Sequence, residues 1–414
     1  MANVSSSNGL EKRPKLRFPG FDEPYRTTPL GEIASLVNRT DPKSNAPIMM
    51  LSAGNGFIMQ SEKYSRDNAG QSLKKYILLK QGELAYNHGA SKAKQFGCCY
   101  ELTEPEARIP YVYHCFKIND HEYTPFIAMA LNNAKMDKQL KRLVSSSVRM
   151  DGLLNISFED YMSVTLHLPS STEQKHIADF LKKIDERIAA QEKLLASLKK
   201  YKRGVFEAVF SQKLRLVPME LQKPWKQYKL SDFATRVTRK NGNQTDIPLT
   251  ISAQYGLIAQ RDFFSKMVAS TDMSGYYLLQ KGEYAYNRST SNEYPFGSIK
   301  RLELYPMGAV STLYLCFAIK EEVVNSDFAK WYFESAQWYK GINNICAEGA
   351  RNHGLLNVPT DGFFNTVHTL PSDPNEQLAV VDYLSNIQKK YEAAQRCLQA
   401  IENLRSGLLQ QLFI

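Results

Sequence analysis

Residues 171–210 read STEQKHIADFLKKIDERIAAQEKLLASLKKYKRGVFEAVF, and this stretch decides the fold. At alternating steps of four and three, its residues are apolar apart from one glutamine: Ile177, Leu181, Ile184, Ile188, Gln191, Leu195 and Leu198. This 3.5-residue spacing is typical of a helix that packs against a second helix. No Gly or Pro lies between Glu173 and Arg203. We therefore expect one rod of roughly 30 residues, on the order of 45–50 Å long, with Ser171 or Thr172 as its N-cap.

A second stretch repeats this pattern 203 residues later. The Glu173-Gln174 start returns as Glu376-Gln377, and the repeating positions hold Val380, Leu384, Ile387, Tyr391, Ala394, Leu398 and Ile401. Two rods of equal period and length predict an antiparallel intramolecular coiled coil. Taken alone, the two helices leave open the alternative that they are unrelated amphipathic surface helices.

The similarity extends into the region before each rod, at an offset of 200 to 202 residues. LKQGELAYN (79–87) corresponds to LQKGEYAYN (279–287), and GLLN (152–155) returns at 354–357. Short apolar runs that end at glycine turns indicate strands between helical stretches, so the expected class is α+β, with no strand order predicted. The duplication predicts a flexible arm (1–20), a first globular domain (21–170), a central long helix (171–213), a second globular domain (214–371) and a C-terminal long helix (372–414).

Composition favours an anionic partner. The 414 residues include 52 Lys and Arg against 42 Asp and Glu, a net charge of +10 with a pI of about 9.1. Nucleic acid is the first expectation and an anionic membrane surface the second. No run of 18 apolar residues and no signal-peptide core is found, so we expect a soluble, cytoplasmic protein without a membrane partner. The six cysteines form no CxxC pair, which predicts reduced thiols and no metal site.

No motif for catalysis or cofactor binding is found in the chain. Glycine-rich dinucleotide and phosphate loops are missing, as is the Asn/Asp-Pro-Pro-Tyr/Phe tetrad that grips a flipped adenine. The seven histidines do not group with Ser, Cys or carboxylates as a catalytic triad does. We therefore expect no enzyme activity and no cofactor in this chain.

Polar loops at corresponding places in the two halves are the candidate DNA contacts. Bases and phosphates are contacted mainly by Arg, Lys, Asn, Gln, Ser and Thr. The first region follows the Gly-Glu-x-Ala-Tyr-Asn strand and comprises Asn87, His88, Ser91, Lys92 and Lys94 in one half and Asn287, Arg288, Ser289, Thr290 and Asn292 in the other. The surrounding frame agrees between the halves while the loops differ, as expected if each half reads a different sequence. The alternatives are solvated loops that drifted after duplication, and asparagines that only form turns.

Two further regions are weaker candidates. The polar turn before each rod contributes Arg149 with Asn155, and Arg351 with Asn352, His353 and Asn357. It could equally serve only to orient the last strand before the helix. The third region comprises Gln60 with Lys63, and Gln260 with Arg261. We expect Tyr86 and Tyr286 to lie in the core rather than to stack on bases.

The arrangement resembles the specificity subunits of type I restriction–modification systems. The similarity rests on Leu-Pro a few residues before each Glu-Gln helix start, on the Gly-Glu-x-Ala-Tyr-Asn blocks and on the opening LRFPGF at 16–21. The resemblance implies two target recognition domains that each read half of a bipartite double-stranded DNA target. It also implies that the helices dock two methyltransferase subunits, which restriction subunits then join. Methylation with S-adenosylmethionine and cleavage with ATP and Mg²⁺ would belong to those partners.

Charge and length suggest how the rods are used. Residues 173–203 carry nine Lys or Arg against five Asp or Glu, whereas residues 376–405 carry four of each. The first rod is thus better suited to phosphates, although we favour protein contacts for most of both surfaces. The rods would separate the two domains by some 35–50 Å, about one turn of duplex or slightly more, which predicts an asymmetric split target. The alternatives are a coiled-coil scaffold that binds only proteins and a self-contained DNA-modifying enzyme.

Overall fold

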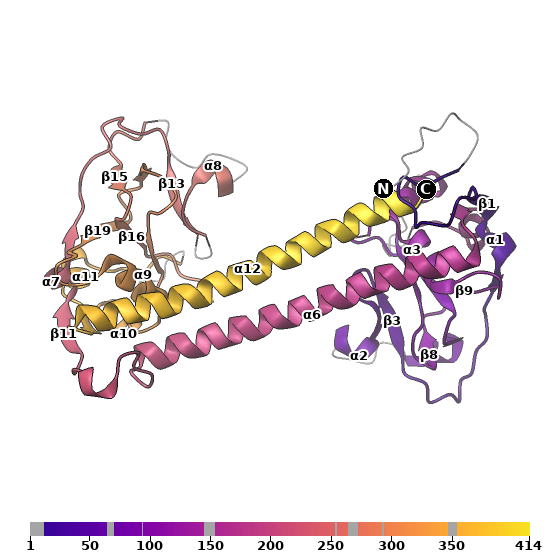
Figure 1. Cartoon of the computed structure of the whole chain (residues 1–414), viewed down its shortest axis with the longest axis horizontal. Coiled ribbons are helices and arrows are strands. Elements are labelled where there is room, and N and C mark those ends of the chain that lie inside the picture. The colour runs from indigo at the N-terminus through magenta and orange to yellow at the C-terminus, as the bar shows by residue number, and fades with distance from the viewer. Residues whose placement is uncertain are drawn as a thin grey trace. The chain divides into compact units, whose positions relative to one another are not determined.

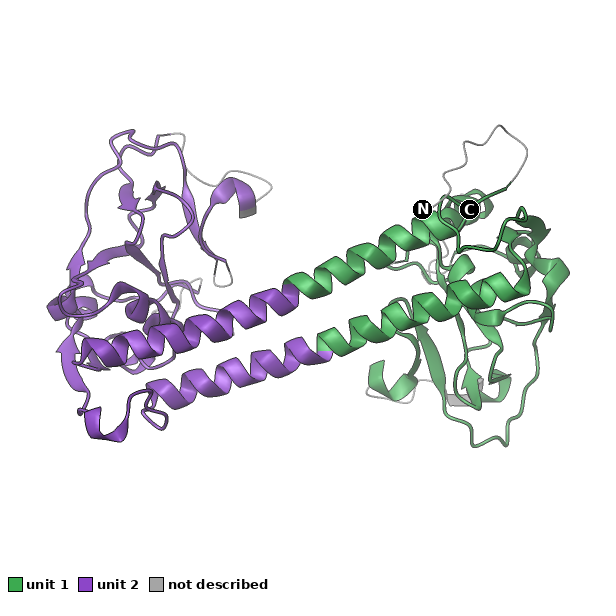
Figure 2. Ribbon diagram, in the orientation of Figure 1, with its two compact units in different colours: residues 1–192, 396–414 green, residues 193–395 purple. Residues whose placement is uncertain are grey.

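The computed structural model describes residues 12–63, 70–92, 94–144, 154–252, 255–263, 272–291, 294–346 and 354–414. Two compact units make up the chain: unit 1 comprises residues 1–192 and 396–414, and unit 2 comprises residues 193–395 (Figure 2). Each unit contains one globular half of the sequence and a part of both long helices, α6 (Ser171–Phe210) and α12 (Pro374–Leu412) (Figure 1).

Unit 1 is built on a four-stranded antiparallel sheet in the order β2–β9–β6–β7. These strands are Ala34–Leu36, His114–Ile118, Leu84–Asn87 and Cys98–Glu101. Three two-stranded antiparallel ribbons accompany the sheet: β1 with β10 (Arg26–Pro29, Thr165–Leu168), β3 with β4 (Met49–Ser52, Gly56–Met59) and β5 with β8 (Ile77–Lys80, Glu106–Ile109). The shorter helices are α1 (Leu30–Ile33), α2 (Gln60–Lys63), η1 (Gly70–Lys75), α3 (Thr124–Leu131), α4 (Ala134–Leu143) and α5 (Phe158–Met162).

Unit 2 repeats this topology. Its four-stranded sheet has the order β12–β19–β16–β17 (Ala234–Arg236, Leu315–Ile319, Tyr284–Asn287, Ser298–Arg301). Its ribbons are β11 with β20 (Lys226–Lys229, Val367–Leu370), β13 with β14 (Leu249–Ser252, Gly256–Ala259) and β15 with β18 (Tyr277–Gln280, Met307–Val310). The remaining helices are η2 (Met219–Leu221), α7 (Leu230–Phe233), α8 (Gln260–Phe263), α9 (Ser326–Glu334), α10 (Tyr339–Ile345) and α11 (Thr360–Phe364).

One inner strand of each four-stranded sheet, β6 in unit 1 and β16 in unit 2, is buried on both faces. In β6, Leu84 and Tyr86 point into the core that also holds the start of α6, whereas Ala85 points into a second core with the ribbons. In β16, the side chains of Tyr284 and Tyr286 likewise point into one core, and that of Ala285 points into the other. Successive strand residues face opposite sides, so a run that is apolar at every position fits a strand covered on both sides.

The Glu-Gln pair at the start of each long helix has the same role in both units. The amide oxygen of Gln174 accepts the backbone N–H of Tyr123 at 2.9 Å, just before α3. Gln377 does the same for Asn325 before α9, at 2.7 Å. Each glutamine also donates to a carbonyl before its own helix, that of Pro169 or Pro371. The motif therefore joins the start of the long helix to the start of a short one.

The two long helices pack against each other and run in opposite directions. In unit 1, Arg405 near the end of α12 donates to Asp185 in the first half of α6. In unit 2, Lys202 near the end of α6 donates to Gln388 in the first half of α12 at 2.6 Å. The predicted α+β class and the antiparallel intramolecular coiled coil are confirmed.

Two local expectations need correction. Ser170, rather than Ser171 or Thr172, caps the first turn of α6, because its hydroxyl accepts the N–H of Glu173 and its carbonyl oxygen accepts the N–H of Gln174. The expected flexible arm is held in place from Leu16 onward. The amide of Leu16 donates to the carbonyl oxygen of Gln411, and the ring of Phe18 meets Phe180 edge-on at 5.5 Å.

Candidate nucleic-acid interface

Two of the predicted contact regions lie side by side in unit 1. The loop that follows β6 meets the segment that leads into α5, because the N–H of Leu154 donates to the carbonyl oxygen of His88 at 2.9 Å. Asn155 is exposed on that segment, and Ser91 and Lys92 are exposed on the loop. The structure thus gathers three polar side chains from two distant parts of the sequence on one edge of the unit.

A glycine fixes the close approach that shapes this loop. The hydroxyl of Tyr86 donates to the carbonyl oxygen of Phe96 at 2.6 Å, and Gly97 follows with φ of +82°. A Cβ on Gly97 would lie 2.4 Å from the carbonyl oxygen of Asn87, closer than any real contact. Gly297 has the same geometry in unit 2, with a distance of 2.1 Å to the oxygen of Asn287. The Phe-Gly pair therefore sets where each candidate loop leaves its strand.

Asn87 and Asn287 form turns. The side-chain oxygen of Asn87 accepts the N–H of Gly89 at 2.9 Å, and that of Asn287 accepts the N–H of Ser289 at 3.0 Å. Both side chains are half-buried. This is the turn-forming role that the sequence left open as an alternative to base contact.

His88 is buried and fully engaged in the fold. Its side chain is 5% exposed, and its ring nitrogens lie 2.7 Å from the carbonyl oxygen of Leu154 and 2.9 Å from that of Val112. The ring stacks on His114, whose Nε2 lies 2.9 Å from the carbonyl oxygen of Ile156. Burial lowers the pKa of His114, and the neighbouring His88 adds to this effect. The two imidazoles hold the 154–156 segment against the loop, and His88 has no ring nitrogen left for a base.

Arg288 takes over this role in unit 2. Its Nη2 donates to the carbonyl oxygen of Leu313 at 2.9 Å and its Nη1 to that of Val358 at 3.4 Å. Its own carbonyl oxygen accepts the N–H of Leu356 at 3.0 Å, as that of His88 accepts Leu154. One guanidinium therefore spans the two carbonyls that two histidines contact in unit 1.

Unit 2 ties its loop to the corresponding segment more extensively. Both the N–H and the hydroxyl of Thr290 donate to the carbonyl oxygen of Gly354, at 2.7 and 3.1 Å. Ser289 forms an isolated antiparallel bridge with Leu355. The side chains of Ser289 and Asn357 are exposed, whereas that of Thr290 is half-buried. Serine and asparagine are thus the groups that this loop and segment offer to solvent.

Two lysines of the predicted set, Lys94 after the loop and Lys63 in α2, both act on the thiol of Cys98. The ammonium of Lys94 donates to the carbonyl oxygen of Asn132 at 2.7 Å. Burial raises the pKa of the Cys98 thiol to about 11, and the positive charges of Lys94 and Lys63 oppose that rise. The charges of both lysines therefore reach the start of β7, and the side chain of Lys63 is exposed.

The two glutamines of the third predicted region, Gln60 and Gln260, share an unusual feature. The side-chain oxygens of Gln60 and Gln260 are both buried, and neither has a hydrogen-bond partner in the described parts of the chain. Gln260 donates to the carbonyl oxygen of Leu249 at 3.4 Å. Arg261 beside it is 68% exposed and lies 3.9 Å from Asp262. Of Gln260 and Arg261, only Arg261 presents a charge to solvent.

Five predicted contacts fall outside the residues that the structure describes: Arg149, Asn292, Arg351, Asn352 and His353. They belong to the loop after β16 and to the two stretches that precede Leu154 and Gly354.

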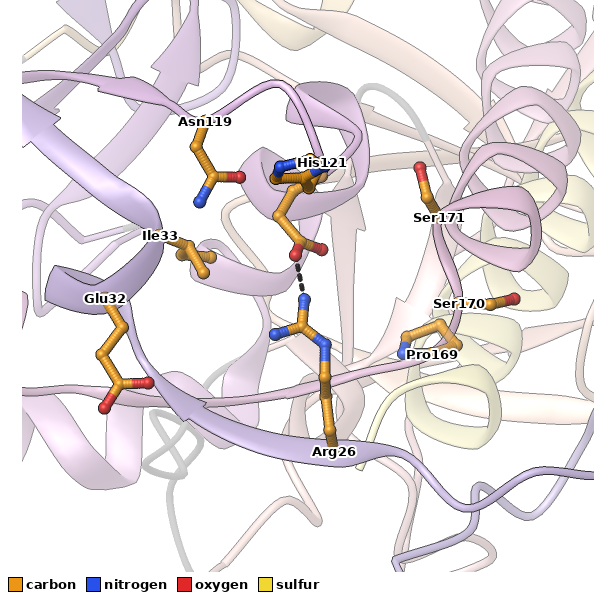
Figure 3. A pocket seen from close by; sticks show the side chains of 9 residues that line it. Arg26, Glu32, Ile33, Asn119, His121, Pro169, Ser170 and Ser171 are labelled. Atoms are coloured by element: carbon orange, nitrogen blue, oxygen red, sulfur yellow. Dashed lines mark hydrogen bonds and ion pairs between the residues drawn. The ribbon is translucent and has the colours of Figure 1, made fainter.

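A polar pocket of about 450 Å³ lies at the start of α6 in unit 1 (Figure 3). Arg26 and Glu122 form an ion pair across it, and Glu122 also accepts the amide of Gln174 at 2.6 Å. Asn119, His121 and Ser171 line the rim. Because its central charges are already paired within the unit, this pocket serves to hold β1 and α6 together.

Sequence reasoning missed a basic groove in unit 2. It has a volume of about 900 Å³, and its cations include Lys202, Lys300 and Lys330. These residues are scattered over three elements, so no local run of charge identifies them. A position-by-position comparison of the two halves could have found them, since Tyr100 occupies the position in the first half that corresponds to Lys300 in the second.

Among the described residues, no three His, Cys, Asp or Glu side chains are placed to hold a metal ion. All six cysteines are free thiols. Tyr86 and Tyr286 are buried, as expected. No helix in the described parts of the chain has the length and apolar character of a membrane span.

Comparison with known proteins agrees with this geometry. Residues 74–200 match the family model described as "Type I restriction modification DNA specificity domain". The fold is similar to that of the HsdS subunit from Thermoanaerobacter tengcongensis, with 14% identity, a TM-score of 0.50 and 97% and 98% of the two chains covered. It is also similar to the type I S subunit from M. genitalium, with 13% identity, a TM-score of 0.56 and coverage of 97% and 99%.

A third similar structure comes from a study of the assembly and conformational transition of the type I R-M system. It is 13% identical, with a TM-score of 0.53 and coverage of 96% and 98%. No curated protein matches the sequence significantly. The resemblance to type I specificity subunits that the sequence predicted is confirmed.

Proposed function

We propose that this protein is the sequence-specific DNA-binding subunit of a type I restriction–modification complex, because residues 74–200 match the model of a type I DNA specificity domain and the fold is similar to that of HsdS subunits. One observation carries the proposal. The two units share a sheet, a register and a loop-supporting glycine, but they present different polar side chains on that frame. A shared scaffold with unlike loops suits two readers of unlike sequences.

Each unit would read one block of a bipartite, asymmetric target in double-stranded DNA. In unit 1, we assign this role to Ser91, Lys92, Asn155 and Lys63, and in unit 2 to Ser289, Asn357 and Arg261, because their side chains are exposed. Amide and hydroxyl groups suit base edges, while lysine and arginine suit phosphates or guanine. His88, Arg288 and Thr290 would support the loops from within.

The partners would be two methyltransferase subunits, with restriction subunits joining through them. The outward faces of α6 and α12 are the proposed docking surface, since exposed residues run along the whole length of both helices, many of them charged on α6 and most of them polar on α12. Adenine methylation with S-adenosylmethionine and cleavage with ATP and Mg²⁺ would take place on those subunits, in the cytoplasm. This chain would supply sequence discrimination only.

Mapping of methylated adenines in the source genome, with and without this gene, tests the proposal. We expect a split target of two short, non-palindromic blocks separated by several unread base pairs, which disappears with the gene. A continuous or symmetric target would contradict two independent readers. An assembled complex that discriminates no DNA sequence would favour a protein-only scaffold, and methylation by the isolated chain with S-adenosylmethionine would favour a self-contained enzyme.

A further inference from the structure

The basic groove of unit 2 lies where the last third of α6 and the middle of α12 meet the β16–β17 hairpin and α9. Its volume is about 900 Å³. Five cations line it, Lys199, Lys202, Lys300, Arg301 and Lys330, against three carboxylates, Glu303, Glu334 and Glu392. The lining therefore carries a surplus of positive charge, which costs folding free energy wherever the charges are partly buried.

Most of these cations already have an internal carboxylate. Lys300 pairs with Glu334 at 2.5 Å, and Lys330 pairs with Glu303 at 2.9 Å. Arg301 pairs with Glu303 at 2.7 Å and with Asp327 at 2.6 Å. These ion pairs fix the walls of the groove and leave those three cations without a need for an external anion.

Lys199 and Lys202 are the exceptions, because neither forms an ion pair with a described carboxylate. The ammonium of Lys202 donates to the amide oxygen of Gln388 at 2.6 Å. It is half-buried, which lowers its pKa; Glu334 and Glu392 oppose that effect, while Lys300 and Lys330 add to it. An ammonium has three N–H donors, so at least one remains for a ligand. The groove thus holds a half-buried cation that has no ion-pair partner among the described carboxylates.

The first half of the chain shows that the fold does not require this charge. The β6–β7 and β16–β17 hairpins have matching registers, in which Tyr100 occupies the position of Lys300 and Glu101 that of Arg301. At the offset of 203 residues, Arg405 stands for Lys202, and there it pairs with the carboxylate of Asp185. Glu402 likewise stands for Lys199. The surplus of positive charge is therefore a feature of unit 2 alone, added to a scaffold that is stable without it.

The groove opens beside the proposed reading loop. Tyr294 lines it, and the N–H of Tyr294 donates to the carbonyl oxygen of Ser291 in that loop at 3.2 Å. Tyr255, 63% exposed, lines it from the tip of the β13–β14 hairpin. An anion held here would lie within a few residues of the side chains assigned to base reading.

We propose that this groove binds a phosphate of the DNA backbone next to the block that unit 2 reads, with Lys202 and Lys199 as its direct contacts. The inference rests on the proposed function and adds a fixed phosphate contact to it. Lysine suits a phosphate as a compact point charge, and phosphate contacts set the register of a protein on duplex without reading sequence. The contact would anchor unit 2 and leave unit 1 without an equivalent.

The salt dependence of DNA binding by the assembled complex tests this contact. For Lys202→Gln, we expect the slope of log Kd against log salt to decrease by about one, with weakening that is the same for every base sequence. Lys202→Arg should retain the slope because it retains the charge. Lys200→Gln, an exposed neighbour outside the groove, is the matched control and should change both quantities less.

A duplex with single phosphates replaced by neutral methylphosphonates locates the contact. One substitution beside the second block should weaken the wild-type complex and leave Lys202→Gln unaffected. Specific binding by the wild type with an unchanged slope in Lys202→Gln overturns the groove proposal while the proposed function stands. Weaker association of methyltransferase subunits in Lys202→Gln, without any change in DNA affinity, overturns it in favour of a protein contact. A wild-type complex without sequence preference overturns both proposals.

Discussion

Glu173 accepts two hydrogen bonds from the guanidinium of Arg17, at 2.8 Å from Nε and 2.7 Å from Nη2, and its side chain is fully buried. The pair ties the segment before β1 to the first turn of α6. Arg215 and Glu376 repeat it in unit 2, where the segment before β11 meets the first turn of α12. The glutamate of the Glu-Gln motif is thus a buried anchor for the incoming chain.

Removing this anchor should destabilise unit 1. Glu173→Ala leaves the Arg17 guanidinium, whose side chain is 14% exposed, without its counter-charge, and we expect a loss of about 3–5 kcal/mol in the free energy of unfolding. Denaturant unfolding measures the change. Glu186→Ala, at an exposed position of the same helix, is the control and should cost less than about 1 kcal/mol. Equal costs for the two variants would argue against the anchor.

Gly97 should tolerate alanine far less well than another glycine of similar backbone conformation. Gly82 has φ of +80° with open space around its missing Cβ, so Gly82→Ala reports the backbone strain alone, about 1 kcal/mol. Gly97→Ala adds a clash with the carbonyl oxygen of Asn87, and we expect a cost at least 2 kcal/mol greater in urea unfolding. Similar costs would mean that the loop moves aside freely.

Unit 2 should lose stability in mild acid because of a buried histidine. Burial lowers the pKa of His368 from 6.5 to about 4. Between these values the unfolded chain binds a proton that the folded chain does not, so stability is complete above about pH 6.5 and is lost as the pH falls towards 4, by about 3 kcal/mol. Leu166 takes this place in the matching ribbon of unit 1. His368→Leu should therefore flatten the pH dependence of unfolding, and an unchanged profile would contradict the assignment.

The two exposed asparagines should report on separate blocks of the DNA target. Asn155→Ala should relax discrimination at one base pair of the first block, and Asn357→Ala at one base pair of the second, each by about 1–3 kcal/mol. Competition binding with single-base variants of the mapped target measures both changes. If either variant altered both blocks, or neither, the separate assignment of the two asparagines would be wrong.

Arg288 should act on recognition through the loop that it supports. Arg288→Lys keeps the charge, but a single ammonium lacks the fork that reaches Leu313 and Val358 together. We expect weaker discrimination of the second block and no change in the first, with the salt dependence of binding unaltered because no phosphate contact is lost. A reduced salt slope would instead show that Arg288 contacts the DNA backbone directly.

The duplication and the long helices could be predicted from the sequence because both leave periodic marks. The heptad spacing of residues 177–198 and the offset of 203 residues are visible without coordinates. The pairing of β6 with β9 is not, since it joins segments about 30 residues apart through packing on two cores. His88 illustrates the limit for sites: a polar residue in a loop suggests exposure, but distant carbonyl groups enclose it.

The positions where helices end or break could not be predicted from the local sequence pattern either. The apolar period of residues 126–143 favours one continuous helix, whereas the structure divides this stretch at Asn132 and Asn133 into α3 and α4. The side chain of Asn133 caps α4 by accepting the N–H of Lys135, while that of Asn132 bonds to the backbone of Cys99. Both asparagines have partners in other elements, and tertiary contacts of this kind leave no mark in the apolar period.

The last residues of the chain complete the core of unit 1. Phe413 stacks on Phe126 with ring centroids 5.0 Å apart, and Lys135 donates to its carbonyl oxygen at 2.6 Å. Residues 396–414 belong to unit 1, whereas unit 2 is one uninterrupted segment. During synthesis on the ribosome, unit 1 can therefore complete its core only after residues 396–414 have left the exit tunnel, whereas all of unit 2 has emerged before them.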